Sequence, residues 1–220
     1  MYSPKYNRTM HLPWSPGGTN DDKRAASVVS LLNVPLVITE KMDGSNTSLE
    51  AGGCFARTHA NVPTHASFDG LKALHATIKY KIPDNIQLFG EWCYALHSIA
   101  YNELPGYFLL FNVRDLNYQK QIWTNWTEVE LWAEDVGIPT VPVLFRGIIS
   151  SEKELQELTE DLAAQPSACG GKREGVVVRI ENSFTDLDFH NCVMKSVRKG
   201  HVQTSEHWAH QEIIKNKLKI

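Results

Sequence analysis

The sequence has little that would place it in a membrane, outside the cell or in a zinc-binding class. Its four cysteines are Cys54, Cys93, Cys169 and Cys192, and none forms a Cys-x-x-Cys pair. Such spacing predicts reduced thiols instead of a disulfide framework or a zinc site. No apolar run approaches the length of a membrane span, and the N-terminus lacks the apolar stretch of a secretory signal. We therefore expect a soluble cytoplasmic protein that does not bind membranes.

Neither sign of charge dominates the chain. It has 22 Lys and Arg against 25 Asp and Glu, a formal net charge of −3. This balance excludes an all-over basic coat for nucleic acids but allows a local basic groove. Internal repeats and low-complexity tracts are also absent from the sequence. With 220 residues and 42% apolar residues, we expect one domain over residues 1–220 that buries its own core.

The expected secondary structure is rich in short strands. Apolar and β-branched runs predict strands at 36–39, 47–50, 54–57, 86–92, 108–114, 140–145, 176–180 and 192–197. Helices are expected at 24–32, at 68–80, after capping boxes beginning at Thr127 and Ser151, and from Ser205 to the end. Strands and helices do not alternate strictly. The order favours an α+β fold with antiparallel sheets over a doubly wound parallel sheet.

The first candidate for chemistry is the segment EKMDGSN at 40–46, directly after an apolar strand. Burial at the end of a strand lowers the pKa of a lysine, and the neutral amine of Lys41 would then be a nucleophile. Gly44 permits a tight turn and close approach of the backbone to a ligand. Taken alone, so short a motif is more often a solvent-facing turn.

Four further motifs follow along the chain. They are Phe89-Gly90-Glu91 at the end of a strand, the aromatic strand YFLLFNVR at 107–114, the segment KREGVVVR at 172–179, and VMKSVRK at 193–199. An aromatic strand by itself is usually core packing. The order of the motifs is more informative than any one of them.

In this order the motifs resemble motifs I, III, IIIa, IV and V of the covalent nucleotidyltransferases, which include RNA ligases, DNA ligases and mRNA capping enzymes. The stretches KMDGSN, ARTH, FGEWCYALHSIAY and HLPWSPG are most similar to phage-type ATP-dependent RNA ligases. The resemblance spans residues from about 5 to 210 and leaves open a virus-encoded protein acting in a host cytoplasm. It implies an ATP-grasp-like α+β nucleotidyltransferase domain with two antiparallel sheets around a nucleotide cleft and flanking helices.

The resemblance also implies a reaction. Lys41 would attack the α-phosphorus of ATP and form lysyl-AMP. The AMP would pass to the 5′-phosphate of an RNA, and a 3′-hydroxyl would then displace it. ATP and Mg²⁺ or Mn²⁺ are the implied cofactors. RNA with 5′-phosphate and 3′-hydroxyl ends is the implied partner.

The implied roles can be carried over residue by residue. Lys41, Glu174 and Lys195 match catalytic positions. Nucleotide contacts fall on Glu40 (adenine, often through its backbone), Asn46, Arg57 (nucleotide or RNA phosphate), Glu91 (ribose hydroxyls), Phe111 (stacking on adenine) and Lys195 (α-phosphate). Asp43 and Glu174 match carboxylates that hold hydrated metal ions.

Two positions depart from the family pattern. Val197 stands where motif V often has a second lysine, so that Arg198 or Lys199 would have to substitute. Asn112 stands where an Asp often follows the stacking aromatic, and it can replace only the hydrogen-bond acceptor of that Asp. Tyr101, Trp14 and the histidines are more simply explained by packing and structural hydrogen bonds.

Three alternatives stay open: a capping guanylyltransferase that uses GTP, a DNA ligase, and a non-catalytic RNA-binding relative. The first two usually carry an OB-fold domain after motif V, and the stretch after Lys195 is too short for one, so we expect no OB-fold or separate C-terminal domain. The joint presence of Lys41, Glu91, Glu174 and Lys195 argues against the third. We expect a monomer and leave open a protein partner that supplies RNA specificity. Lys215, Lys217 and Lys219 fit a solvated helix end better than an RNA contact.

Overall fold

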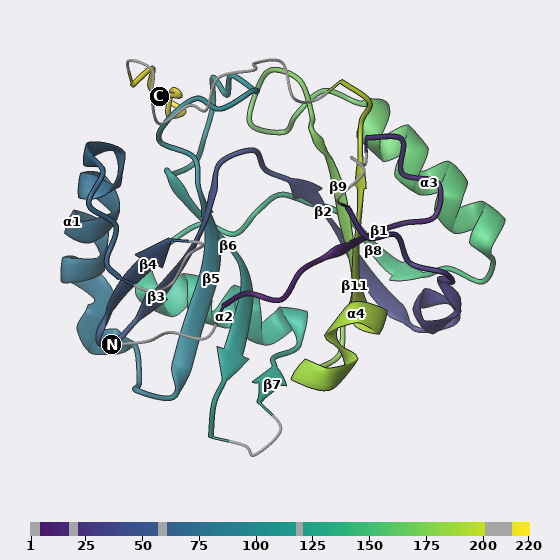
Figure 1. Cartoon of the computed structure of the whole chain (residues 1–220), viewed down its shortest axis with the longest axis horizontal. Helices are drawn as coiled ribbons and strands as arrows, with labels where there is room; N and C mark the ends of the chain where they lie inside the picture. The colour runs from purple at the N-terminus through teal and green to yellow at the C-terminus, as the bar shows by residue number, and fades with distance from the viewer. Residues whose placement is uncertain (1–4, 18–21, 57–60, 118–120, 201–212) are drawn as a thin grey trace.

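Two β-sheets lie side by side in the computed structural model, which describes residues 5–17, 22–56, 61–117, 121–200 and 213–220 (Figure 1). The first sheet has the order β1 (Met10–His11), β11 (Val193–Val197), β9 (Gly175–Ile180), β2 (Pro35–Lys41), β8 (Val143–Ile148). The second has the order β10 (Phe184–Thr185), β7 (Ile122–Trp123), β6 (Phe108–Asp115), β5 (Ile86–Trp92), β3 (Ser45–Glu50), β4 (Gly53–Ala56). Neighbouring strands are antiparallel except β1 and β11. The α+β prediction is confirmed, with this one short parallel pair added.

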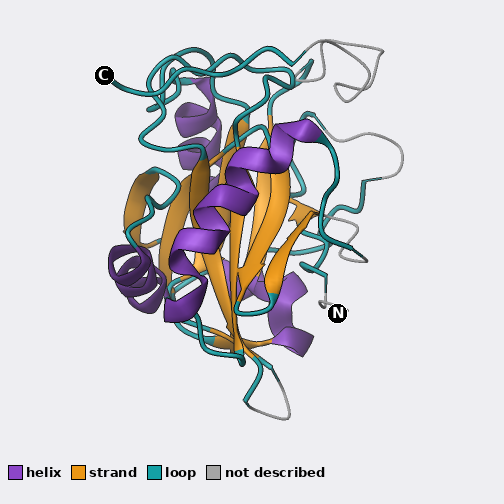
Figure 2. Ribbon diagram, turned by 90° about the vertical axis from the view of Figure 1, so that its left-hand side faces the viewer, coloured by secondary structure: helices purple, strands orange, loops and turns teal. Residues whose placement is uncertain are grey.

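The helices cover the outer faces of the sheets (Figures 1 and 2). They are α1 (Asp69–Ile78), α2 (Trp126–Val136), α3 (Glu152–Ala164) and the short α4 (Phe189–Cys192), with 3₁₀ turns at Val29–Leu31, Ala66–Phe68, Lys79–Lys81 and Asp186–Asp188. α1 packs beside β4, α2 on β6 and α3 on β9. No helix within the described ranges is long and apolar enough to cross a bilayer.

Alternation along β2 decides which residues can reach the space between the sheets. Leu36 and Ile38 pack into the core beneath α3, whereas Val37 belongs to the core of the second sheet. Because side chains alternate between the faces of a strand, Lys41 lies on the same face as Val37. The chemistry-bearing end of β2 therefore points toward the second sheet.

A third core cluster joins the two sheets. It combines Phe89 of β5 and Trp123 of β7 with Phe189 of α4 and Val193 of β11, and Val177 of β9 packs against it. The aromatic rings of this cluster pack against one another, and the centroids of Phe89 and Trp123 lie 5.3 Å apart. Lys41 pairs with Gly175, two residues along β9 from Val177. The aromatic cluster thus packs against the same sheet face on which Lys41 lies.

The cap of α2 differs from the prediction. Asn125, not Thr127, is the N-cap, and its side chain accepts a hydrogen bond from Glu128 N at 2.9 Å. The Thr127 hydroxyl instead accepts from Arg146 at 2.9 Å. Asn125 and Glu128 have the same spacing as the box predicted two residues later, so the pattern alone could not choose between them. The box at Ser151 is confirmed, because its hydroxyl accepts from Glu154 N at 3.2 Å.

Three predicted elements were wrong in type or extent. The helix expected at 24–32 is reduced to the 3₁₀ turn Val29–Leu31, because Arg24 pairs with His11 and Ala25 N donates to His11 O. The strand expected at 140–145 runs from Val143 to Ile148. The helix expected from Ser205 is not helical over 213–220, where the chain is extended against residues 94–104. Residues 205–212 of that prediction lie outside the described residues.

Candidate active site

Lys41 forms an ion pair with Glu174 across the junction of β2 and β9. Lys41 Nζ donates to Glu174 Oε2 at 2.7 Å, and the two side chains are 24% and 5% exposed. Pairing of Lys41 with Gly175 brings this about, since Glu174 directly precedes that glycine. A Cβ at position 175 would stand 2.0 Å from Ser196 O. The glycine is therefore required by the close approach of β11, which carries Lys195.

The sequence prediction of a lowered pKa for Lys41 was wrong for this arrangement. Burial does lower the pKa of this ammonium, but Glu174, Glu91 and Asp43 outweigh burial and hold the pKa above its usual value. The prediction considered only the apolar strand. Of the carboxylates that reverse the sign, Glu174 and Glu91 come from distant segments of the chain, and Asp43 lies two residues after Lys41.

Glu91 stands on β5 opposite Asn46 of β3. With Glu174 and Asp43 it forms the group of carboxylates around Lys41. Its Oε1 accepts a hydrogen bond from Gly44 N at 3.2 Å. Burial raises the pKa of Glu91 to about 8, although the nearby Lys41 opposes the shift. Within the described part of the chain, Asn46 Oδ1 is buried with no hydrogen-bond partner. A buried acceptor of this kind is suited to a donor supplied by a ligand.

Gly44 allows close approach of the backbone to β5, and the approach to a ligand stays a prediction. A Cβ at this position would lie 2.6 Å from Trp92 O. Asp43, beside it, is also held by protein groups. Its Oδ2 accepts from Ser98 N at 2.7 Å and Ile99 N at 2.8 Å, and its own N–H donates to the Tyr101 hydroxyl at 2.8 Å. One carboxylate oxygen of Asp43 thus fixes a neighbouring loop.

Glu40 points away from Lys41, as alternation along β2 requires. Its Oε2 lies 3.3 Å from Arg173 Nε and accepts a hydrogen bond from Ala168 N at 2.9 Å. Glu40 and Arg173 are 1% and 4% exposed. The carboxylate therefore anchors the segment that leads into Glu174, and any contact of Glu40 with a nucleotide would come from its backbone.

Replacing Arg173 by Met should strongly destabilise the protein, because it leaves the buried Glu40 carboxylate without its cation. Removal of one partner of a buried pair typically costs about 3–5 kcal/mol. The matched control is Arg146→Met, whose exposed pairs with Glu130 and Glu181 should contribute about 0–1 kcal/mol. Denaturant unfolding of both variants measures the difference. Equal losses would show that the Glu40–Arg173 pair is not the anchor described.

Lys195 of β11 shares the sheet face of Lys41. It pairs with Val177, which in turn pairs with Thr39, so Lys195 and Lys41 lie two strands apart on one face. Lys195 Nζ stands 3.7 Å from Asp22 Oδ1. Asp22 also lies 3.5 Å from His11 Nε2, and burial, together with Lys195, lowers the pKa of His11 to about 4.

Sequence reasoning missed Asp22 and Arg173, because each meets its partner only through the fold. Arg198, a predicted substitute for a motif V lysine, donates its backbone N–H to Glu174 O at 2.9 Å. Lys199 is exposed. Arg57 lies outside the described residues, as do His201, His207 and Trp208.

Phe111 of β6 is half-buried and packs against the aromatic cluster. Its ring meets Tyr6 edge-on, with the two centroids 5.1 Å apart. Asn112 keeps the acceptor role predicted for it, since its Oδ1 accepts from Arg179 at 2.8 Å. It also donates from Nδ2 to the Tyr6 hydroxyl at 3.3 Å, which a carboxylate could not do. Tyr101 is 1% exposed, so its packing interpretation holds.

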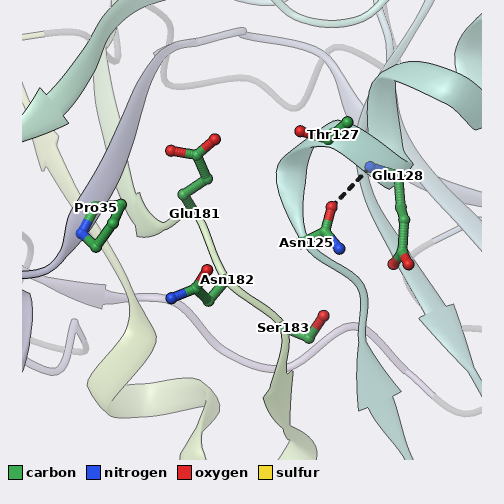
Figure 3. Close-up of a pocket in the computed structure, with 7 residues that line it drawn as sticks. All are labelled: Pro35, Asn125, Thr127, Glu128, Glu181, Asn182 and Ser183. Carbon is green, nitrogen blue, oxygen red and sulfur yellow. Dashed lines mark hydrogen bonds between the residues drawn. The ribbon is translucent and has the colours of Figure 1, made fainter.

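Figure 3 shows the residues around a separate depression, none of which belongs to the candidate site described above. Most of the residues that line it are polar, and two of them, Glu128 and Glu181, are carboxylates. The lining consists of Pro35, Asn125, Thr127, Glu128, Glu181, Asn182 and Ser183. Asn125 is occupied there as the N-cap of α2, and Glu181 pairs with Arg146. Two carboxylates make this depression unsuited to a phosphate-bearing ligand.

Solved structures that share this fold include RNA ligases. A variant of Naegleria gruberi RNA ligase with ATP and Mn matches with a TM-score of 0.61 and 16% identity, over 91% of this chain and 58% of that one. Naegleria gruberi RNA ligase with PPi matches at 0.54 and 15%, over 89% and 61%. An archaeal ATP-dependent RNA ligase matches at 0.54 and 16%, over 91% and 49%. The fold is thus that of the ATP-dependent RNA ligases, and this chain spans less than two thirds of each of these proteins.

The sequence profile of the RNA ligase family matches residues 34–197. This chain therefore belongs to the RNA ligase family. A comparison with curated proteins found no match.

Proposed function

We propose that this chain is an ATP-dependent RNA ligase that carries AMP on Lys41 during the reaction. The observation that carries the proposal is the 2.7 Å contact of Lys41 Nζ with Glu174, on a sheet face that also presents Lys195. A nucleophile and a second cation thus share one sheet face, and a carboxylate contacts the nucleophile. Membership in the RNA ligase family supports the same reaction class.

In the first step Lys41 Nζ attacks the α-phosphorus of ATP. A phosphorus–nitrogen bond forms, and the bond to pyrophosphate breaks. The amine must be neutral to attack, and Glu174 is the acceptor already in contact with it. Neutralising the charge of Glu174 removes the interaction that holds the amine protonated. Lys195 is placed to grip the α-phosphate from the same sheet face.

Two further displacements would complete ligation. An oxygen of the RNA 5′-phosphate attacks the phosphorus of Lys41-AMP, which frees the amine and joins AMP to the RNA. A 3′-hydroxyl then attacks the activated 5′-phosphate, and AMP leaves. Each step is an in-line displacement, so the protein contributes mainly positioning and charge neutralisation.

The residues fit a divalent ion bound largely by water and phosphate. The described residues hold no cage of three or more His, Cys, Asp or Glu ligands, and Mg²⁺ typically uses one or two carboxylates and keeps several waters. Glu174 would hold the ion, with Asp43 contributing its Oδ1, because Oδ2 already accepts two backbone N–H groups. A bound Mg²⁺ or Mn²⁺ would supply neutralisation of phosphate charge.

The nucleotide would occupy the face of the second sheet. Phe111 would stack on the adenine and Glu91 would bind the ribose hydroxyls. Asn46 Oδ1 would gain the donor it lacks among the described residues. Glu40 would contribute only through its backbone, and Arg57 would contact a phosphate.

Labelled ATP and GTP test this proposal directly. We expect α-labelled ATP with magnesium to leave label on the denatured protein, and GTP to leave none. Addition of 5′-phosphorylated RNA should discharge the label and yield joined RNA, whereas 5′-hydroxyl RNA should not. A panel of nicked duplex, single strand and broken tRNA anticodon would identify the substrate.

The alternatives give different results in the same assay. Label from GTP would indicate a capping-type guanylyltransferase. Joining of nicked DNA in preference to RNA would indicate a DNA ligase. RNA binding with no label from either nucleotide would indicate a non-catalytic relative.

A further inference from the structure

Residues 213–220, here called the C-terminal strap, lie along the loop at residues 93–104. Backbone hydrogen bonds join them in both directions: Leu96 N to Ile214 O at 2.8 Å, Lys217 N to Tyr101 O at 2.9 Å and Leu104 N to Lys217 O at 3.0 Å. Figure 1 shows the yellow C-terminal end at the top of the molecule, beside these loops. The strap therefore contacts the 93–104 loop mainly through main-chain pairing, and the ammonium of Lys215 also lies over the Tyr94 ring, 5.2 Å from its centroid.

Asn216 is the centre of this contact. It is 3% exposed, and its Oδ1 accepts from Tyr101 N at 2.9 Å. Its Nδ2 donates to Cys93 O at 2.9 Å and Ala95 O at 3.5 Å. A side-chain amide supplies both donors and an acceptor in this way, which Asp, Ser and Ala cannot do at the same place. Asn216 thus fixes main-chain groups at both ends of one loop.

The same loop holds Asp43. Ser98 N and Ile99 N both donate to Asp43 Oδ2, and Asp43 N donates to the Tyr101 hydroxyl. Tyr101 is therefore shared: its backbone N–H bonds Asn216, and its hydroxyl bonds Asp43. A continuous set of hydrogen bonds leads from the strap to the turn that follows Lys41.

The other side of the loop is held by the segment before Glu174. Asn102 N and Glu103 N donate to Cys169 O at 3.1 and 2.9 Å. A Cβ at Gly171 would lie 2.3 Å from Ala100 O, so the two segments are in close main-chain contact. With that side fixed, the contact with the strap decides where the Ser98 and Ile99 amides stand.

We propose that Asn216 is a positioning residue for Asp43, acting through the 93–104 loop, so that this one buried amide contributes to adenylylation without touching the nucleotide. This inference rests on the proposed function only for its catalytic consequence. If Asn216 is lost, the loop shifts and Asp43 loses its fixed orientation beside Lys41. A misplacement of about 1 Å in such a site can slow a reaction by about 100-fold.

Hydrogen exchange and adenylylation of Asn216→Ala test the proposal, with Ile214→Ala as the matched control in the strap, since the Ile214 side chain is 60% exposed. We expect faster exchange at the Ser98, Ile99 and Asp43 amides, and a rate of AMP uptake at saturating ATP reduced about 10- to 100-fold, with KM for ATP little changed. Asn216→Asp keeps the acceptor for Tyr101 N, but its second carboxylate oxygen would face Cys93 O and Ala95 O without a donor, so it should also accelerate exchange at these amides. Ile214→Ala should match the wild type in both measurements.

A double-mutant cycle separates positioning from general destabilisation. If Asn216 acts through Asp43, the variant with both Asn216→Ala and Asp43→Ala should be no slower than Asp43→Ala alone. Multiplied losses would overturn the proposal, and so would unchanged exchange at the three amides in Asn216→Ala or, should that variant not fold, in Asn216→Asp. A wild-type protein that takes up no AMP would instead refute the proposed function, while accelerated exchange would still uphold the placement of Asp43 by Asn216.

Discussion

Lys41→Arg should fold as the wild type does and take up essentially no AMP from ATP. The guanidinium keeps the positive charge beside Glu174, Glu91 and Asp43, but it stays protonated and is not a nucleophile. Loss of a nucleophile costs enzymes roughly 10⁴- to 10⁶-fold in rate, so covalent labelling should fall below detection. Label from α-labelled ATP on denatured protein measures this loss.

Lys41→Ala is the companion variant, because it removes both nucleophile and charge. It should also fail to take up AMP, and it should unfold at lower denaturant than Lys41→Arg, since Glu174 at 5% exposure then loses its contact with the Lys41 ammonium. Comparison of the two separates the chemical role of the amine from its role in holding the carboxylates together. AMP uptake by Lys41→Arg at a rate near that of the wild type would refute the assignment.

Glu174→Ala should slow AMP uptake by roughly 100- to 1000-fold, a loss typical of removing one charged or polar group from a preorganised site. The side chain contacts Lys41 directly and is the group proposed to hold the metal. Glu174→Gln keeps the shape and removes the charge. Raised magnesium should therefore restore part of the rate to Glu174→Gln, because weaker metal binding is offset by concentration.

Glu91→Ala provides the contrast within the same group of carboxylates. Its proposed contact is with the ribose, so it should raise the ATP concentration needed for half-maximal labelling, and raised magnesium should not restore activity. Magnesium titrations at several ATP concentrations measure both effects. If magnesium restores Glu91→Ala and not Glu174→Gln, the two roles have been exchanged.

Local sequence patterns predicted the strands that carry the site. Apolar β-branched runs before Lys41 and after Glu174 correctly gave β2 and β9, and alternation within them places Lys41 and Lys195 on one face. Gly44 also indicated a close approach of the backbone, and the structure shows such an approach to β5. Features determined by a few adjacent residues were therefore accessible before the fold was known.

Features that depend on distant segments were not accessible. Over 213–220, pairing with residues 94–104 takes the place of the predicted helix, because buried main-chain bonding around Asn216 outweighs local helix propensity. The raised pKa of Lys41 likewise depends on distant segments. Burial could be inferred from β2 alone, but Glu174 and Glu91, which with Asp43 reverse the shift, come from elsewhere in the chain.

The most direct test of the central claim is to find where AMP is attached. The wild-type protein, incubated with ATP and magnesium and then digested, should yield one peptide heavier by one AMP, with the modification on Lys41. The same peptide from the Lys41→Arg protein should be unmodified. AMP on Lys195 or any other residue, with Lys41 unmodified, would contradict the account.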